Sequence, residues 1–219
     1  CEGISSVTAA DIAAAKDAGF VIKLLAIAEK LTAEGTKTGA DGTTGVSVRV
    51  HPTLLPREHP LAAVRGAFNA VFIEAENAGE LMFYGQGAGG KPTASAVMGD
   101  LISAARSIVL GGPGRAETTT GQVSALPISA AVTSYYIGLD VADQPGVLAR
   151  IAQLFAEHGV SIEIMRQTIH RDADSNIESA ELRIVTHRAS EAALAATVEA
   201  VKGLDVINSV TSVLRVEGV

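Results

Sequence analysis

The chain has 219 residues, of which 17 are basic and 24 acidic, giving a formal net charge of −7. This length fits one or two domains of roughly 100–200 residues each, and the acidic balance argues against nucleic acid or an anionic membrane as a partner. The single cysteine excludes a disulfide scaffold, and no apolar run approaches the roughly 18 residues of a transmembrane helix. We therefore expect a cytoplasmic protein without a metal site or membrane contact.

The first half of the chain predicts helices and short strands. Thr8 and Asp11 form a capping pair for a helix expected over residues 8–19. Apolar runs and alternation predict strands at residues 21–28, 46–50, 70–75 and 81–84, with a loop or hairpin turn at residues 32–44. Three prolines in residues 51–60 predict an irregular segment. A long helix with an apolar stripe is expected to begin at residue 92 or 93.

Residues 111–134 separate this region from a second pattern. They open with Gly-Gly-Pro-Gly and contain two charged residues, a composition typical of a linker. Strands are then expected at 135–141, 160–170, 177–186 and 206–216, with helices at 147–158 and after the capping residue Ser190. This βαββαβ order predicts a ferredoxin-like domain over residues 135–219 and an α+β chain as a whole.

A glycine-rich stretch reads Gly-Gln-Gly-Ala-Gly-Gly-Lys-Pro-Thr over residues 85–93. Glycine lets the backbone approach a phosphate or a flat ring before a helix N-terminus. The spacing satisfies G-x-G-x-x-G, but the strand and acidic residue that a dinucleotide fold needs do not follow. A nucleoside triphosphatase is also disfavoured, because Pro92 replaces the magnesium-binding hydroxyl of a P-loop. A partial cofactor contact and a plain structural turn both remain open.

Residues 140–148 form the second informative stretch. An acid and a Pro-Gly pair precede the helix expected at residue 147, whose free N–H groups suit a carboxylate or an amino-acid zwitterion. The structural alternative is that Asp143 caps this helix, with Pro145 in its first turn.

Several motifs occur in order over the first hundred residues. They are Cys1-Glu2-Gly3-Ile4-Ser5, Arg49-Val50-His51-Pro52-Thr53, Pro60-Leu61-Ala62-Ala63-Val64, Phe68-Asn69-Ala70-Val71, and Tyr84-Gly85-Gln86-Gly87-Ala88-Gly89 through Gly99-Asp100. Together these motifs resemble bacterial homoserine dehydrogenase. The later pattern Leu139-Asp140-Val141-Ala142-Asp143-Gln144-Pro145-Gly146-Val147-Leu148 is similar to an ACT domain, the amino-acid-sensing module often fused to this enzyme. The two resemblances cover nearly the whole chain.

The resemblance implies an incomplete mixed-sheet catalytic and dimerisation domain with helices on one face over residues 1–110, followed by the linker and the ACT domain. The family interconverts aspartate semialdehyde and homoserine with NAD(P), in the route to threonine and methionine. Its Rossmann domain and catalytic lysine would precede Cys1, so the resemblance implies no catalytic residue in this chain and no activity of the chain alone. The cofactor, mostly held by the missing domain, would contact Gly89, with Gly87 and Ala88 beside it.

The resemblance also implies a homodimer or higher homo-oligomer with amino-acid feedback through the ACT domain. Threonine is the expected effector. The implied contacts are Asp143, Gly146, Val147 and Leu148 from the loop, with Ser161 and Ile162 from a partner subunit. The alternative function is a non-enzymatic amino-acid-sensing module, and a P-loop-like nucleotide binder is the third.

Overall fold

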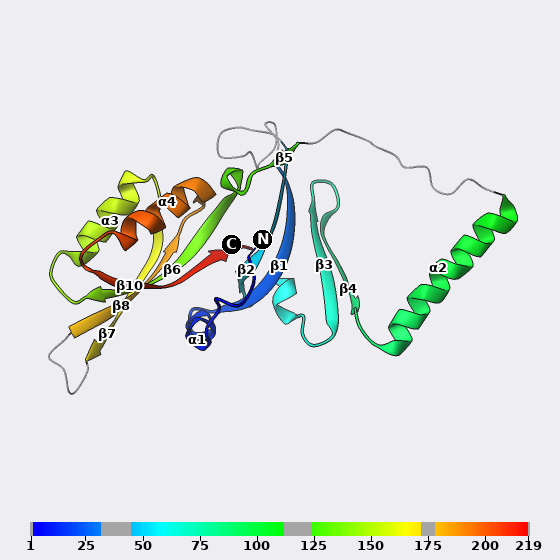
Figure 1. Cartoon of the computed structure of the whole chain (residues 1–219), viewed down its shortest axis with the longest axis horizontal. Helices are drawn as coiled ribbons and strands as arrows, with labels where there is room; N and C mark the ends of the chain where they lie inside the picture. The colour runs from blue at the N-terminus through cyan, green and yellow to red at the C-terminus, as the bar shows by residue number, and fades with distance from the viewer. Residues whose placement is uncertain (1, 32–44, 112–123, 172–177, 219) are drawn as a thin grey trace. The chain divides into compact units, whose positions relative to one another are not determined.

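The computed structural model describes residues 2–31, 45–111, 124–171 and 178–218 of an α+β chain (Figure 1). The chain divides into two compact units, one formed by Cys1–Pro56 with Val123–Val219 and the other by Arg57–Gln122. The predicted loop at 32–44 lies outside the described residues, as do residues 112–123 of the predicted linker.

One sheet runs through the first unit. Its strands are β1 (Phe20–Leu31), β2 (Gly45–Pro56), β6 (Val132–Ala142), β7 (Ile162–Arg171), β8 (Glu178–Thr186) and β10 (Ile207–Val216), in the order β1-β2-β10-β6-β8-β7. Two short strands, β5 (Ala125–Leu126) and β9 (Ala189–Ser190), pair with β2 and β6. Along the main order, β2 and β10 run parallel and the other neighbours antiparallel.

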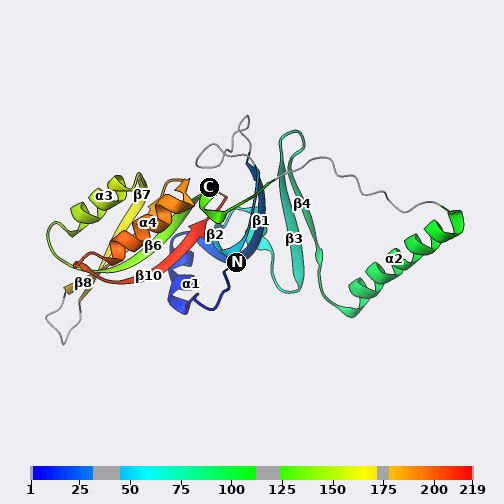
Figure 2. The ribbon, with the colours of Figure 1, turned by 45° about the horizontal axis from the view of Figure 1, so that its top comes forward.

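The predicted βαββαβ arrangement is confirmed. It consists of β6, α3 (Val147–Glu157), β7, β8, α4 (Glu191–Lys202) and β10. Both helices cover the same face of the sheet, as Figure 1 and Figure 2 show. Apolar side chains from α3, α4, β6 and β8 form the core between the two helices and the sheet, including Ile151, Phe155, Leu182, Leu194 and Leu139. Ser190 caps α4 as predicted, by accepting a hydrogen bond from the Ala193 N–H at 3.1 Å.

The first predicted helix is confirmed as α1 (Ala9–Asp17). The Thr8 hydroxyl accepts from the Asp11 N–H at 3.2 Å, and the Asp11 carboxylate accepts from the Thr8 N–H at 2.7 Å. These reciprocal bonds satisfy two N–H groups that a helix start leaves free. Ala14 and Ala15 of α1 then contribute to a second buried cluster, with Leu54, Tyr136, Val185, Leu214 and Val216.

The expectation of an irregular segment at 51–60 is wrong over its first half. β2 continues through Pro52 to Pro56, paired with β1 from Phe20↔Pro56 to Leu31↔Gly45. Proline lacks a backbone N–H, which matters only where the neighbouring strand needs that donor. On its other edge β2 pairs with β10 at Thr53 and Leu54 only, and with β5 at Val46 and Ser47, so much of that edge needs no donor.

The predicted linker and domain limits differ from the structure in two places. Residues 125–134 of the predicted linker include β5, the 3₁₀ helix η2 (Ile128–Ala130) and the start of β6. The sheet also joins β2 to β10, so residues 1–56 share a compact unit with the βαββαβ segment instead of with residues 57–110. Local composition cannot show this, because strand pairing across 160 or so residues leaves no trace in a sequence window.

The second unit contains η1 (Pro60–Ala63), β3 (Phe68–Ala75), β4 (Gly79–Gln86) and α2 (Gly90–Leu110). β3 and β4 form the predicted hairpin, paired from Phe68↔Gln86 to Ala75↔Gly79. Among the described residues of this unit, Ala62 alone is buried.

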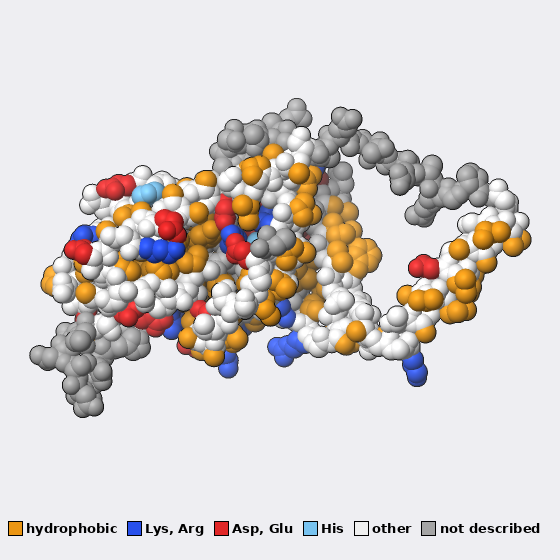
Figure 3. Space-filling view, viewed as in Figure 1, with side chains coloured by type: hydrophobic (Ala, Val, Ile, Leu, Met, Phe, Trp, Pro, Cys, Tyr) orange, Lys and Arg blue, Asp and Glu red, His pale blue; other side chains and the backbone are white. Residues whose placement is uncertain are grey.

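Hydrophobic side chains lie exposed along α2 (Figure 3). They are Val97, Met98, Leu101, Ile102, Ile108, Val109 and Leu110. By length and composition α2 could cross a membrane, the one such helix in the part of the chain that the structure describes. The expectation from the sequence concerned unbroken apolar runs of about 18 residues, and α2 contains none of that length. In α2 small and polar residues alternate with apolar ones over 21 residues.

Candidate functional site

The predicted cofactor contacts lie in the glycine loop, defined as residues 85–90, between β4 and α2. Gly89 is the N-cap of α2 with φ 129°, a backbone conformation that favours glycine. It offers no side-chain cap, and its carbonyl oxygen accepts from the Thr93 N–H at 3.1 Å. The positive end of the helix dipole therefore lies behind a bare stretch of backbone.

The glycines of this loop differ in their surroundings. A Cβ at Gly85 or Gly90 would meet nothing within 4 Å, whereas a Cβ at Gly89 would lie 3.2 Å from Pro92 Cγ. A Cβ at Gly87 would collide with the Asn69 side chain. The backbone is thus open toward the outside at Gly85 and Gly90. Gly87 is required by its contact with Asn69, and Gly89 is favoured by its φ of 129°.

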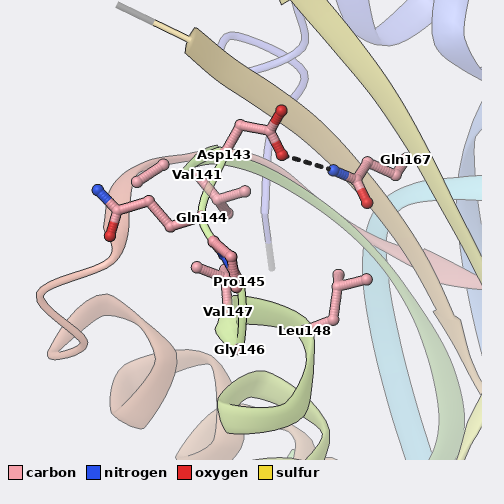
Figure 4. A pocket seen from close by; sticks show the side chains of 9 residues that line it. Val141, Asp143, Gln144, Pro145, Gly146, Val147, Leu148 and Gln167 are labelled. Atoms are coloured by element: carbon pink, nitrogen blue, oxygen red, sulfur yellow. Dashed lines mark hydrogen bonds between the residues drawn. The ribbon is translucent and has the colours of Figure 1, made fainter.

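A cavity of about 400 Å³ lies where β6 ends and α3 begins (Figure 4). Its lining consists of Val141, Ala142, Asp143, Gln144, Pro145, Gly146, Val147, Leu148 and Gln167. This volume is within the range of small-molecule sites. The four effector contacts predicted from the loop, Asp143, Gly146, Val147 and Leu148, all line this cavity.

The loop geometry decides how Asp143 is used. Gly146 is the N-cap of α3, with φ 91° and no side-chain hydrogen bond. Asp143 instead accepts a hydrogen bond from Gln167 Nε2 on β7, at 3.2 Å from Oδ1. The alternative that Asp143 caps the helix is therefore wrong. A carboxylate and an uncapped helix N-terminus face one cavity, which complements the ammonium and carboxylate groups of a free amino acid.

Gln167 is the lining residue that sequence reasoning missed. It lies five residues beyond Ile162 on β7, and only the position of β7 in the sheet brings it opposite the loop. Ser161 and Ile162 do not line the cavity of this chain. The Ser161 carbonyl accepts from the His187 N–H at 2.8 Å, and Ile162 packs partly against the core. Their contribution from a partner subunit stays a prediction.

A charge cluster lies at the other end of β6, with Arg215 and Glu191 buried and Glu2 exposed. Arg215 on β10 donates to Glu191 on α4 and to both carboxylate oxygens of Glu2, at 2.8 and 2.9 Å. The Tyr135 hydroxyl donates to Glu191 at 2.8 Å. Burial alone would lower the pKa of Arg215, but the bonds to Glu2 and Glu191 outweigh it and raise this pKa. The same bond lowers the pKa of Glu2.

A second arginine, Arg49 on β2, lies between Glu29 and Glu217, at 3.0 and 2.7 Å. His51 is buried nearby, with Nδ1 3.1 Å from the Pro52 carbonyl oxygen and no partner for Nε2 among the described residues. Burial lowers the pKa of His51, the hydrogen bond to the Pro52 carbonyl oxygen partly opposes this, and the positive charges of Arg215 and Arg49 lower it further. The two arginines link residues of the first 56 positions to the βαββαβ segment.

Two family models match the sequence. The model described as homoserine dehydrogenase matches residues 1–102, and the model described as ACT domain matches residues 135–206. Both matches occur where the sequence motifs resemble these families.

Curated relatives match the chain along its whole length. A homoserine dehydrogenase from Corynebacterium glutamicum is 50% identical over 217 residues, which are 99% of this chain and 46% of the relative. One from Bacillus subtilis is 36% identical over 218 residues, which are 99% of this chain and 47% of the relative. The chain therefore spans about half the length of the curated relatives it matches.

Solved structures give the same result. A homoserine dehydrogenase from Thiobacillus denitrificans superposes with a TM-score of 0.82 and 32% identity, over 98% of this chain and 46% of that one. A Staphylococcus aureus homoserine dehydrogenase at pH 7.0 gives a TM-score of 0.56 and 27% identity, over 99% of this chain and 47% of that one. The described fold thus corresponds to about half of each solved relative.

Proposed function

The chain belongs to the homoserine dehydrogenase family, and from this premise we propose that it supplies a cofactor-contacting loop and an amino-acid sensor to an NAD(P)-dependent oxidoreductase. The proposed reaction is the interconversion of L-aspartate 4-semialdehyde and L-homoserine, in the route to threonine and methionine. The nicotinamide cofactor supplies or accepts the hydride. The proposed location is the cytoplasm, and the proposed assembly is a homodimer or higher homo-oligomer, without nucleic acid or membrane.

The glycine loop carries this proposal. Gly85 and Gly90 have open space where a side chain would be, and Gly89 leaves the start of α2 uncapped. A flat ring or a phosphate group can approach such backbone without steric conflict. The residues present therefore fit one side of a nicotinamide cofactor. Gly89, with Gly87 and Ala88, would hold the ring in place, and no catalytic residue is proposed within this chain.

The exposed apolar residues of the second unit support the proposal that another part of the protein packs against this unit. A two-stranded hairpin and a helix without buried residues gain little stability from their own contacts. The relatives are about twice as long as this chain. We assign the apolar side chains of β3, β4 and α2 to contacts with the part of a family-length protein that this chain does not cover.

A fusion tests the proposal. We expect no turnover by the 219-residue chain, and NAD(P)-dependent oxidation of homoserine once this chain is joined to the part of the C. glutamicum relative that it does not cover. In the fusion, Gly89→Val places a branched side chain at φ 129° and should reduce turnover at least about 100-fold by misplacing the ring. Turnover by the chain alone would refute the proposal, as would an active Gly89→Val fusion.

The cavity beside Asp143 favours amino-acid sensing, with threonine as the proposed effector. Threonine should inhibit the fusion, and calorimetry on the 219-residue chain should show heat with threonine but not with isoleucine or methionine. If threonine binds while the fusion stays inactive, the non-enzymatic sensing module becomes the better account. No heat from any of the three amino acids would leave the cavity without this role.

A further inference from the structure

Among the glycines of the glycine loop, Gly87 is the one at which an added Cβ would lie closest to another atom. A Cβ at this position would lie 1.7 Å from Nδ2 and 2.5 Å from Cγ of Asn69. Side-chain Cβ atoms do not approach other heavy atoms to under 3.0 Å. The space that excludes any larger residue at position 87 is therefore filled by the Asn69 side chain, in contrast to the open space at Gly85 and Gly90.

Asn69 reaches Gly87 through the register of the hairpin. It is paired with Gly85 across β3 and β4, two residues before Gly87. The Gly87 N–H donates to the Ala67 carbonyl oxygen at 3.0 Å, just outside the hairpin ladder. Gly87 is thus held at its N–H by Ala67 and at its Cα by Asn69, at the point where the chain leaves β4.

We infer that Asn69 is a positioning residue for the glycine loop, whose side chain fills the space beside residue 87 and so fixes the direction of the chain from β4 to the start of α2. This inference deepens the proposed function and rests on it, because the direction of the loop matters only if a cofactor contacts it. Asn69 acts through Gly87 and touches no reacting atom. A loop already held in one direction loses less conformational entropy when a ligand binds.

The contact predicts that two substitutions compensate each other. Gly87→Ala introduces a Cβ that collides with Asn69, so the hydrogen bond from residue 87 to Ala67 should weaken. Asn69→Ala removes the colliding atoms and should restore it in the double variant. Amide exchange measured on the fusion described under the proposed function tests this directly. Protection of the residue 87 amide should fall about tenfold in Gly87→Ala, which is about 1.4 kcal/mol of local opening, and return in the double variant.

Cofactor binding gives the second measurement, in the active fusion. Asn69→Ala should raise the Kd for the reduced nicotinamide cofactor about tenfold through loss of loop orientation, with a larger effect on KM for the cofactor than on kcat. Asn69→Leu keeps a side chain branched at Cγ and should stay within about threefold of the unmodified protein, because the role is steric. The matched control is Asn77→Ala in the hairpin turn, which should change neither quantity.

The two measurements separate failure of this inference from failure of the proposed function. If the fusion binds cofactor but Asn69→Ala neither changes its Kd nor rescues Gly87→Ala, the positioning role is wrong and the proposed function stands. If Asn69→Leu loses as much affinity as Asn69→Ala, the amide itself is needed and the steric role is wrong. If the unmodified fusion binds no cofactor, the proposed function fails and takes the positioning role with it, even where amide exchange shows the predicted compensation.

Discussion

The two compact units of this chain differ in where their apolar side chains lie. In the first unit, two buried clusters cover both faces of one sheet, and Leu139, Ile151 and Leu182 are completely enclosed. In the described part of the second unit, Ala62 alone is buried, and the large apolar residues of β4 and α2 face outward. The first unit is therefore stabilised by its own contacts, whereas the described residues of the second unit leave their large apolar side chains exposed.

This difference assigns the two proposed roles to different kinds of structure. The cavity beside Asp143 lies in the self-stabilised unit, so effector binding should be measurable on this chain. The glycine loop lies in the unit whose described apolar residues are exposed, so the proposed cofactor binding should need the rest of a family-length protein. The proposed sensing and the proposed catalysis would therefore make different demands on chain length.

The largest expected effect comes from the charge cluster within the first unit. Arg215→Met keeps a long side chain but leaves Glu191, which is 6% exposed, without its main counter-charge. Breaking a buried ion pair from one side costs about 3–5 kcal/mol. We expect a loss of this size in the free energy of unfolding, measured by urea denaturation of the 219-residue chain.

The matched control for this variant is Arg150→Met. Arg150 pairs with Asp205 at 2.7 Å, but the two side chains are 50% and 77% exposed. Such a pair contributes at most about 1 kcal/mol. Equal losses for the two variants would show that the Arg215 cluster is not a buried pair and would remove the electrostatic link between Glu2 and α4.

The next largest effect on stability is expected from replacing a buried leucine of the first unit, compared with an exposed leucine of the second. Leu182→Ala removes a fully buried side chain and should cost about 2–5 kcal/mol in the free energy of unfolding. Leu101→Ala changes a side chain that is 58% exposed on α2, and should cost less than about 0.5 kcal/mol in this chain.

The same leucine pair should behave differently in the fusion. If a neighbouring surface covers α2 there, Leu101→Ala should become as destabilising as Leu182→Ala. An unchanged small cost for Leu101→Ala in an active fusion would show that α2 stays exposed in the complete enzyme, and the explanation of its apolar face would be lost.

Local patterns predicted much of the fold. The cap formed by Thr8 and Asp11 and the βαββαβ order were both visible in short windows, because capping and hydrophobic periodicity act between near neighbours. The prolines at 52 and 56 led to the wrong prediction of an irregular segment, because a proline interrupts a strand only where an adjacent strand needs its N–H donor. That adjacent strand is β10, more than 150 positions away.

The same distinction holds for the candidate sites. Residues 143–148 form a contiguous loop, and the sequence alone indicated that they belong together. Gln167 and Asn69 lie beside their neighbours only because of the strand register, which cannot be deduced from the sequence alone. The bond between Arg215 and Glu2 joins residues 213 positions apart. Such contacts follow from the assembled sheet and need the structure to be seen.

The smallest expected effect is a pH dependence of the first unit. His51 has its pKa lowered from 6.5 by burial and, to a smaller extent, by Arg215 and Arg49, with the hydrogen bond to the Pro52 carbonyl oxygen and the charge of Glu217 acting in the opposite direction. The unfolded chain therefore takes up the proton first, and stability falls as the pH drops below about 6.5. In the neutral ring, Nδ1 can donate its proton to the Pro52 carbonyl oxygen. A second proton, on Nε2, would have no acceptor among the described residues.

His51→Phe removes this titration and keeps a flat ring in the buried site. The slope of the unfolding free energy between about pH 7.5 and 5.5 should therefore become smaller, in a range that stays above the titration of Glu2, whose pKa Arg215 lowers from 4.5. The unmodified chain, measured in the same buffers, provides the reference slope. An identical slope for the unmodified chain and His51→Phe would mean that His51 takes up its proton as readily when folded as when unfolded. The self-stabilised unit would then lack a buried histidine that Arg215 and Arg49 keep from taking up a proton.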